Sequence, residues 1–271
     1  GIIFVNGQRI TYMKKESNSY FASQNKIYTD KLSECVIELN IKSQGKVFER
    51  ISKMYDRIYI DEVQDMVGYD LEILKNLIAT KSEVIMVGDP RQCTYSTHSA
   101  KKYKKYSFGK IDEFLKKECR NLDVEIDDYT LNCTYRNNNL ICSFAYKLYP
   151  NRTPVTFINK AHNGFDGVKI IKIEDVDAYI EKTKAVQLRE NKKTKVNMKY
   201  PYYNFGESKG LEFKRILIYP TKPMWDWIID NSKELKDQSR AKFYVAITRA
   251  FDSVVIVCKD KRKCDLPMIK L

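Results

Sequence analysis

The stretch Arg57-Ile-Tyr-Ile-Asp-Glu-Val-Gln-Asp65 decides the fold of this 271-residue chain. Its short apolar run ends abruptly in two carboxylates, and a second apolar run ends in the same manner at Val87-Gly-Asp-Pro-Arg-Gln92. In an open parallel sheet, ligands bind outside the carboxyl ends of the strands. The two stretches therefore predict two strands of one parallel sheet whose carboxyl ends form a ligand site.

Asp61 and Glu62 are the candidate chemical groups at this site. In phosphoryl transfer, one aspartate holds the metal ion that bridges the phosphates, and a second polar side chain positions the attacking water. We therefore predict that Asp61 is a magnesium ligand and that Glu62 activates water. The alternative is an ordinary strand with a solvated acidic end, because carboxylates are common on protein surfaces.

The sequence around these stretches predicts an α/β fold. A strand at 58–60, an amphipathic helix at 71–78 and a strand at 84–87 follow one another, which is typical of a parallel sheet with crossover helices. The same reasoning places further helices at 30–39, 111–119 and 140–149, and strands at 168–173, 215–219 and 253–257. We predict two domains, 1–126 and 127–271, with the acidic run at 125–128 as the hinge.

The charge of the chain indicates a polyanionic partner. Its 48 Lys and Arg residues exceed its 35 Asp and Glu residues, which gives a net charge of +13. A positive field of this size attracts phosphate backbones, so nucleic acid is the first candidate partner. The alternative is that the lysine content reflects genome composition, because Asn and Ile are also plentiful.

Cysteine usage and hydropathy narrow the class of protein further. The seven cysteines never form a CxxC pair, so we expect neither a zinc module nor a disulfide framework. We expect the thiols to be reduced, as in a cytoplasmic protein. No apolar stretch approaches the ~20 residues of a membrane span. The chain opens at Gly1 without an initiator methionine, so we expect a fragment of a longer protein.

Three more segments follow the two carboxylate-tipped strands. They are Asn132-Cys-Thr-Tyr-Arg-Asn137, Gly206-Glu-Ser-Lys-Gly-Leu-Glu-Phe213 and Tyr244-Val-Ala-Ile-Thr-Arg-Ala250. In this order the five segments resemble motifs II to VI of the superfamily 1A helicases, the family of UvrD, Rep and PcrA, over residues 57–257. The resemblance implies two RecA-like lobes of the P-loop NTPase fold, with the first lobe incomplete. It also implies ATP and Mg²⁺ as cofactors and single-stranded DNA as a partner, with RNA not excluded.

The resemblance assigns the nucleotide contacts. Gln92, in the tight turn that contains Asp89, would sense the terminal phosphate, and Arg136 and Arg249 would contact the γ-phosphate. A guanidinium suits that role because its planar fork grips phosphate oxygens. The alternatives are a glutamine in a surface turn and solvated surface arginines.

The remaining nucleotide and DNA contacts come from motifs IV and V. By resemblance, Tyr135 would stack on the adenine and Glu212 would bind the ribose. Ser208, Lys209 and Gly210 would form the turn that lies beside ATP and DNA. The alternative for Lys209 and Glu212 is that they are ordinary loop charges.

The segment Lys101-Lys-Tyr-Lys-Lys-Tyr106 interleaves cations with aromatic rings. Grooves for single strands combine lysines that track phosphates with rings that stack on bases. The nucleic-acid candidates here are Tyr95, Lys101, Lys102, Tyr103, Lys105 and Tyr106. Tyr95 is followed by Ser-Thr-His-Ser, which departs from the family's motif III. The alternative is a solvated helix face.

One element of the family is missing from the sequence. A P-loop requires GxxxxGK[ST], but Gly45-Lys46 is followed by Val47, and Gly109-Lys110 is followed by Ile111. Family members carry this loop before motif II, so we expect the chain alone to be inactive as an ATPase. About seventy residues separate motifs IV and V, where UvrD-type helicases insert a large accessory domain.

Two classes of function remain open. The first is a portion of an ATP-dependent helicase or translocase that acts on single-stranded or partly duplex DNA. The second is a non-catalytic module that keeps the helicase fold and docks DNA or a nuclease partner. Short UvrD-like proteins of this outline resemble the helicase subunits of bacterial anti-phage systems such as Gabija.

Overall fold

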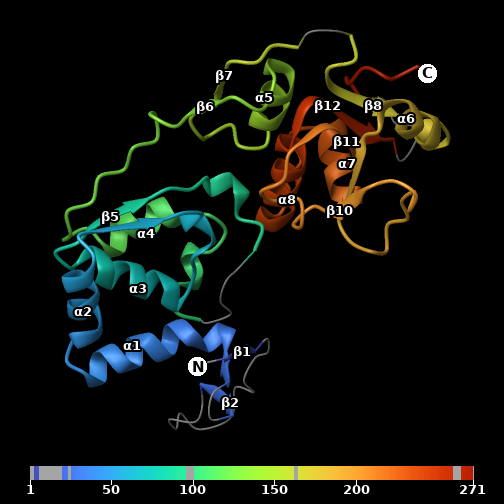
Figure 1. Cartoon of the computed structure of the whole chain (residues 1–271). Coiled ribbons are helices and arrows are strands. Elements are labelled where there is room, and N and C mark those ends of the chain that lie inside the picture. Colours follow the sequence, from blue (N-terminus) through green and yellow to red (C-terminus); the bar gives the residue numbers. More distant parts are fainter. Residues whose placement is uncertain are drawn as a thin grey trace. The chain divides into compact units, whose positions relative to one another are not determined.

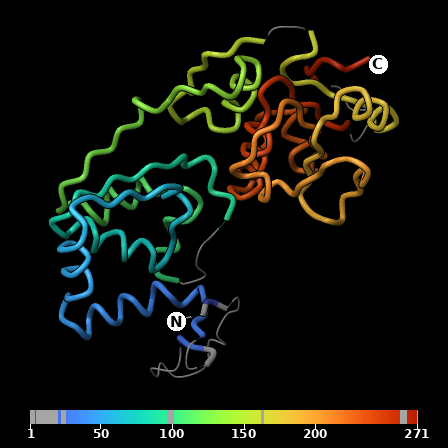
Figure 2. Tube along the Cα trace, viewed as in Figure 1, coloured from blue at the N-terminus to red at the C-terminus, as the bar shows by residue number. Residues whose placement is uncertain are grey.

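The computed structural model describes residues 3–5, 20–23, 26–95, 101–161, 164–258 and 264–270. The chain divides into two compact units, Gly1–Ile126 and Asp127–Leu271 (Figure 1 and Figure 2). The division falls within the acidic run at 125–128. The Ser-Thr-His-Ser run after Tyr95 lies outside the described residues.

The first unit is built on a parallel pair of strands. Strand β4 (Arg57–Ile60) pairs with β5 (Glu83–Met86), and helix α3 (Tyr69–Ile78) connects them. Alternate residues of both strands, such as Ile60 and Val84, pack against the buried cores of this unit. This strand, helix, strand arrangement is the one that the sequence predicts.

The other elements of the first unit surround this pair. Its helices are α1 (Leu32–Lys42), α2 (Lys46–Met54) and α4 (Ile111–Glu118), and its 3-10 turns include η3 (Val63–Asp65), η4 (Pro90–Gln92) and η5 (Lys104–Tyr106). A separate three-stranded sheet contains β1 (Ile3–Val5), β3 (Lys26–Tyr28) and β2 (Phe21–Ser23) in that order. Fully buried Leu71, Leu74 and Phe114 form the centre of the core.

The second unit contains a five-stranded sheet in which all neighbours run parallel. Its order is β10 (Tyr202–Asn204), β9 (Val186–Arg189), β11 (Phe213–Tyr219), β12 (Ala250–Val257) and β8 (Gly167–Ile171). A further parallel pair is formed by β6 (Cys133–Thr134) and β7 (Thr156–Phe157). Parallel sheets read as nearly continuous apolar runs because both faces are covered, and the central strands β11 and β12 do so.

Helices cover both faces of this sheet. Ile216 and Ile218 of β11 belong to a core shared with α5 (Asn139–Tyr146), α7 (Lys222–Ile229) and α8 (Asp237–Thr248). Leu217 and Tyr219 belong to a second core, shared with α6 (Val176–Thr183). The predicted α/β class with parallel sheets and crossover helices is confirmed. None of the helices in the described residues is long and apolar enough to cross a membrane.

Candidate functional site

The carboxyl ends of β4 and β5 bring the predicted carboxylates of the first unit to one edge. The strands stay joined past their ends, because Val87 N–H donates to Ile60 O (2.9 Å) and Val63 N–H donates to Val87 O (3.1 Å). Between these bonds the chain turns at Glu62, whose φ of 54° lies in the left-handed region. That conformation is uncommon for a residue other than glycine and clusters at functional sites. Both Asp61 and Glu62 are exposed there.

Gln64, which the sequence reasoning missed, connects the two strand ends. Its side chain is 1% exposed, its amide NH₂ donates to the Glu62 carboxylate, and its Oε1 accepts from Asp89 N–H (3.1 Å). A Cβ at Gly88 would lie 3.1 Å from Val63 N and would collide with the Gln64 side chain. Gln64 therefore fixes Glu62 relative to the turn after β5. Gln64 stands between Val63 and Asp65, so no local pattern in the sequence shows that its amide is buried and must find hydrogen-bond partners.

The turn after β5 places Asp89 and Gln92 at the same edge. Asp89 Oδ1 accepts from the Arg91 backbone N–H (3.1 Å) and from Arg91 Nε (2.7 Å), and Oδ2 accepts from Gln92 Nε2 (3.0 Å). The Asp89 carboxylate therefore organises its own turn. The Gln92 amide points toward Asp89, and its role as a phosphate sensor stays a prediction.

Asp61 has the chemistry of a single magnesium ligand. Its Oδ1 accepts from Glu62 N–H (2.7 Å), and the carboxylate is exposed. Mg²⁺ usually keeps several waters and takes one or two carboxylates together with substrate phosphates. No group of three or more His, Cys, Asp or Glu side chains that could hold a metal occurs in the described part of the chain. The residues therefore fit a metal held jointly with a nucleotide, rather than a site made by the protein alone.

The lysine-tyrosine segment at 101–106 belongs to the core of the first unit. Tyr106 is 2% exposed, and its hydroxyl donates to Glu118 Oε1 (2.6 Å). Tyr103 donates to Glu72 Oε2 (2.8 Å), and burial together with this bond raises the pKa of its hydroxyl. Both rings lie edge-on to Phe114, with centroids 5.1 and 5.4 Å away. In this conformation the two rings are packed against Phe114, and their stacking on bases stays a prediction.

The lysines of this segment are engaged in the same way. Lys102 pairs with Glu72 and Lys105 pairs with Glu118, each at 3.1 Å. Lys101 and Tyr95 are exposed, and their contacts with nucleic acid stay predictions.

In the second unit, Arg136 and Glu212 contact each other. Arg136 Nε donates to Glu212 Oε1 (2.7 Å), and Nη2 forms an ion pair with the same oxygen. Arg136 Nη1 also lies 3.5 Å from Thr248 O. Arg136 and Glu212, which we expected to bind γ-phosphate and ribose, therefore form an ion pair with each other. Through its contacts with Glu212 and Thr248, Arg136 links motifs IV, V and VI.

Arg249 is directed into the second unit. It is 2% exposed, and its guanidinium donates to Val245 O (3.2 Å), Leu211 O (3.4 Å) and Thr248 Oγ1 (3.3 Å). A contact with a γ-phosphate would require this side chain to leave those carbonyls. In this conformation Arg249 fixes the motif V loop to the end of α8.

Two asparagines that the sequence reasoning did not single out hold motif IV against motif VI. Asn137 Nδ2 donates to Thr248 O (3.1 Å) and Ala250 O (2.7 Å). Asn138 Nδ2 donates to Asp252 O (2.7 Å), and its Oδ1 accepts the first N–H groups of α5 as an N-cap. The carbonyl groups that accept from the two side-chain amides lie more than a hundred residues away in the sequence, so no local pattern shows these contacts.

The other predicted residues of the second unit differ in accessibility. Tyr135 is 73% exposed and available for stacking. Ser208 is fully buried, and its hydroxyl donates to Phe205 O (2.7 Å); its contact with nucleic acid stays a prediction. Lys209 is half-buried, and exposed Gly210 has a φ of 81° that permits the turn.

The predicted residues lie at opposite ends of the strands in the two units. Asp61 and Glu62 follow the carboxyl end of β4, whereas Glu212 and Arg249 immediately precede the amino ends of β11 and β12. The sequence therefore places acids at the carboxyl edge of one sheet and the Arg–Glu network at the amino edge of another.

Comparison with known proteins gives one family. Residues 7–110 match the family model of the UvrD/REP helicase N-terminal domain. No curated protein matches the chain. Among solved structures, the arterivirus nonstructural protein 10 helicase is similar at 18% identity and a TM-score of 0.44, over 74% of this chain and 38% of that one. The complex of that helicase with DNA is similar at 18% identity and a TM-score of 0.45, over 74% of this chain and 39% of that one. The PRRSV helicase is similar at 16% identity and a TM-score of 0.42, over 73% of this chain and 34% of that one.

Residues 7–110, all in the first unit, are similar to the UvrD/REP helicase N-terminal domain, and the second unit lies outside that match. The chain spans less than two fifths of the length of the viral helicases compared above.

Proposed function

We propose that this chain supplies motifs II to VI of an ATP-dependent superfamily 1A helicase or translocase that acts on single-stranded or partly duplex DNA. The observation that carries the proposal is the exposed Asp61–Glu62 pair at the carboxyl edge of β4. The UvrD/REP match over residues 7–110 includes this pair.

Each acidic residue then has a defined task. Mg²⁺ bound together with ATP would supply positive charge against the phosphates. Asp61 offers one exposed carboxylate to that ion, and Glu62 accepts the proton of the attacking water. Gln64 holds Glu62 in position through its buried amide. Asp89 and Gln92 form the turn that faces the same edge.

In this proposal the two units are the two RecA-like lobes, 1–126 and 127–271. The second lobe contributes Arg136 and Arg249, and Tyr135 stacks on the adenine. The 271 residues contain no GxxxxGK[ST] loop, which cradles phosphates through backbone amides. The phosphate cradle therefore comes from outside this chain, and the chain alone does not turn over ATP.

A second candidate is a non-catalytic module for DNA or a nuclease partner. It is favoured by the contacts of the two arginines, because Arg249 is buried and Arg136 is paired with Glu212. If these contacts persist in the presence of nucleotide, the motifs maintain the fold of the unit rather than stabilise a transition state.

ATP hydrolysis tests the two candidates. It is measured for the 271-residue chain and for a longer protein that includes a P-loop, each with and without single-stranded DNA. We expect turnover by the longer protein only, stimulated by DNA. Glu62→Gln in that protein should lower turnover by roughly 10²–10⁴-fold while nucleotide still binds, because a general base contributes about that much.

Glu83→Gln is the matched control, because Glu83 is exposed at the opposite end of the strand pair and contacts Arg57. It should leave turnover unchanged. Unchanged turnover in Glu62→Gln would show that another group activates the water. A longer protein that is silent, and that binds oligonucleotides with a steep salt dependence indifferent to ATP analogues, would favour the binding module.

A further inference from the structure

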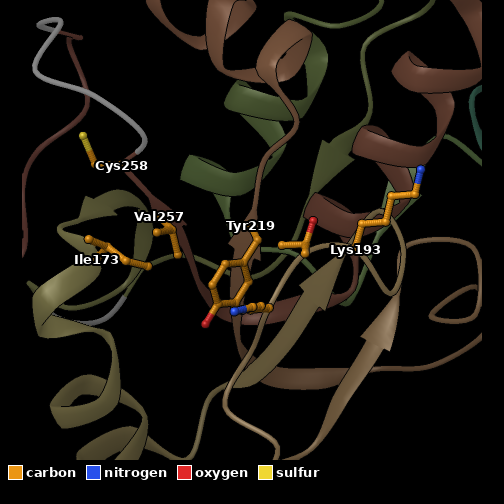
Figure 3. Close-up of a pocket in the computed structure, with 7 residues that line it drawn as sticks. Ile173, Lys193, Tyr219, Val257 and Cys258 are labelled. Carbon is orange, nitrogen blue, oxygen red and sulfur yellow. The ribbon is translucent and has the colours of Figure 1, made fainter.

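A pocket opens at the carboxyl ends of the central strands in the second unit. Its volume is about 380 Å³, and its walls come from the ends of β11 and β12, from the turn after β8 and from the loop after β9. The lining residues are Ile173, Lys193, Thr194, Lys195, Tyr219, Val257 and Cys258 (Figure 3). We call this the carboxyl-edge pocket. Because Glu212 and Arg249 precede the amino ends of the same strands, it is distinct from the motif IV to VI network.

The topology of the sheet favours a ligand at this place. From β9 the chain continues to the edge strand β10, whereas from β11 it continues in the other direction to β12. Adjacent strands whose connections diverge leave a crevice outside their carboxyl ends, which is where open α/β sheets bind ligands. Lys193 and Lys195 follow β9 and Tyr219 ends β11, so the pocket is lined from both sides of this divergence.

The loop that contributes the lysines is held by a buried amide. Gln187 is fully buried in β9, donates to Asn197 O (2.8 Å) and accepts from Asn197 N–H (2.9 Å). The same Gln187 Oε1 accepts the Tyr219 hydroxyl (2.9 Å). Burial, followed by the nearby Asp177, raises the pKa of Tyr219 to about 12, so this hydroxyl stays protonated as a donor. One side chain thus fixes the loop and the pocket wall together.

A buried arginine supports the same loop. Arg189 is 7% exposed, its Nη1 donates to Thr194 O (2.9 Å), and its guanidinium lies 4.7 Å from the centre of the Tyr202 ring. No carboxylate among the described residues pairs with it. A buried cation without a counter-ion favours a nearby anion. Because Arg189 donates to Thr194 O, its positive charge lies next to the loop that carries Lys193 and Lys195.

The two lysines of the pocket remain available to a ligand. Both are exposed, and neither forms an ion pair with a carboxylate in the described part of the chain. Neighbouring acids are already engaged, since Asp177 accepts from Asn197 Nδ2 (2.8 Å) and Glu190 pairs with Lys242 (2.7 Å).

The rest of the lining is largely apolar. Ile173 is exposed beside the pocket, whereas Val257 and the Tyr219 ring are nearly fully buried in its wall (Figure 3). Pockets of this size hold small ligands, and lysine ammonium groups bind phosphates as point charges. The pocket therefore combines a positive rim with an apolar wall, which suits an anion attached to a ring.

We propose that the carboxyl-edge pocket binds the phosphate of a nucleotide unit, with Lys193 and Lys195 on the phosphate and the apolar wall against the base or sugar. The phosphate comes either from a free mononucleotide or from a nucleic-acid chain. This site goes beyond the proposed function, because it uses none of the residues assigned to ATP hydrolysis or to the Arg–Glu network.

Isothermal titration of the 271-residue chain with AMP, with adenosine and with a dT hexamer tests the proposal. We expect AMP or the hexamer to bind and adenosine to bind far more weakly. The double substitution Lys193→Gln/Lys195→Gln should weaken the affinity at least about fivefold, because it removes both phosphate contacts. Binding of AMP identifies a site for free nucleotide, and binding of the hexamer without AMP identifies a site for a nucleic-acid backbone.

Lys233→Gln/Lys236→Gln is the control, because it removes the same charge from two exposed lysines outside the pocket. It should change the affinity less than twofold. Equal affinities for both double variants, or equal affinities for adenosine and AMP, would overturn the site. Binding of AMP and of the hexamer that both survive Lys193→Gln/Lys195→Gln would do so while leaving the proposed helicase function intact, because that function is tested at Glu62 in the other unit.

Discussion

Two lysine-rich segments of this protein differ in what their side chains contact. In residues 101–106 of the first unit, Tyr103 and Tyr106 pack against Phe114, and Lys102 and Lys105 are paired with glutamates. In residues 191–195 of the second unit, the lysines stay exposed around the carboxyl-edge pocket, and the buried groups lie beneath them in β9. The segment that looks most like a nucleic-acid groove by composition thus has its two tyrosine rings packed against the core.

The difference arises from the aromatic residues. Side chains three residues apart lie on the same side of a 3-10 helix, and η5 begins directly after Tyr103. Tyr103 and Tyr106 therefore reach the same core, while Lys104 and Lys105 between them stay exposed. The 191–195 loop has no apolar residue, so its lysines remain in solvent. Composition alone predicts a polyanionic partner for the protein. The spacing of apolar residues determines which side chains are buried and which remain exposed to bind it.

The largest expected effect is that of Tyr106→Ala. Removing a ring that is 2% exposed should lower the unfolding free energy of the first unit by about 3–5 kcal/mol. Tyr106→Phe loses only the bond to Glu118 and should cost about 1 kcal/mol. Circular dichroism in urea measures the loss. Fluorescence of Trp225 and Trp227, both in α7, reports separately on the second unit.

Tyr129→Ala serves as the control, because Tyr129 is 72% exposed and its loss should stay within about 0.5 kcal/mol. If Tyr106→Ala leaves stability intact and instead weakens oligonucleotide binding, the ring belongs to a nucleic-acid surface, and the contrast between the two segments is wrong.

Gln187→Ala should have the next largest effect, on the second segment. It leaves the Asn197 backbone groups and the Tyr219 hydroxyl without their partner, at a cost of about 2 kcal/mol measured by Trp225 and Trp227 fluorescence in urea. Affinity for AMP or the dT hexamer should also fall, because the lysine loop loses its anchor while its charges remain.

Gln238→Ala is the matched control for this experiment. Gln238 is exposed on α8, so the change should leave both stability and affinity unaltered. Full ligand affinity in Gln187→Ala, together with the expected loss of stability, would show that the loop does not need this anchor to hold the lysines.

The fold was predictable where local pattern and burial agree. Strands β4, β5, β8, β11 and β12 and helices α1, α3, α4 and α5 all coincide with predicted segments, with shifts at their ends. Strand β9 was missed because its four residues Val186–Arg189 are too few to show a clear pattern, and its polar Gln187 and Arg189 are buried. Their polar groups are satisfied by a loop that the sequence pattern does not show. Helix α8 was also missed, because motif VI was read as a functional segment without a structure.

For the candidate site, the sequence supplied positions but not contacts. Asp61 and Glu62 are exposed at a strand end, as their place in the sequence suggests. The inward direction of Arg249 and its hydrogen bonds to Val245, Leu211 and Thr248 depend on the packing of α8 against the motif V loop, which no spacing reveals. Gln64 and Asn137 act through amides whose partners come from other segments. Roles that depend on such distant partners require the three-dimensional structure.

The smallest expected effect is that of Lys102→Gln/Lys105→Gln, and it compares the two segments directly. Both lysines form ion pairs with partly exposed glutamates, and solvent screening leaves such pairs with little effect on stability. The double variant should therefore keep nearly all of its stability by circular dichroism and bind AMP and the dT hexamer as the unchanged chain does. Lys116→Gln/Lys117→Gln, on α4, provides a matched change of charge. If the first double variant weakens binding as much as Lys193→Gln/Lys195→Gln does, charge alone governs the affinity, and the pocket has no special role. If only the pocket variant weakens it, the fold, rather than the number of lysines, determines where phosphate binds.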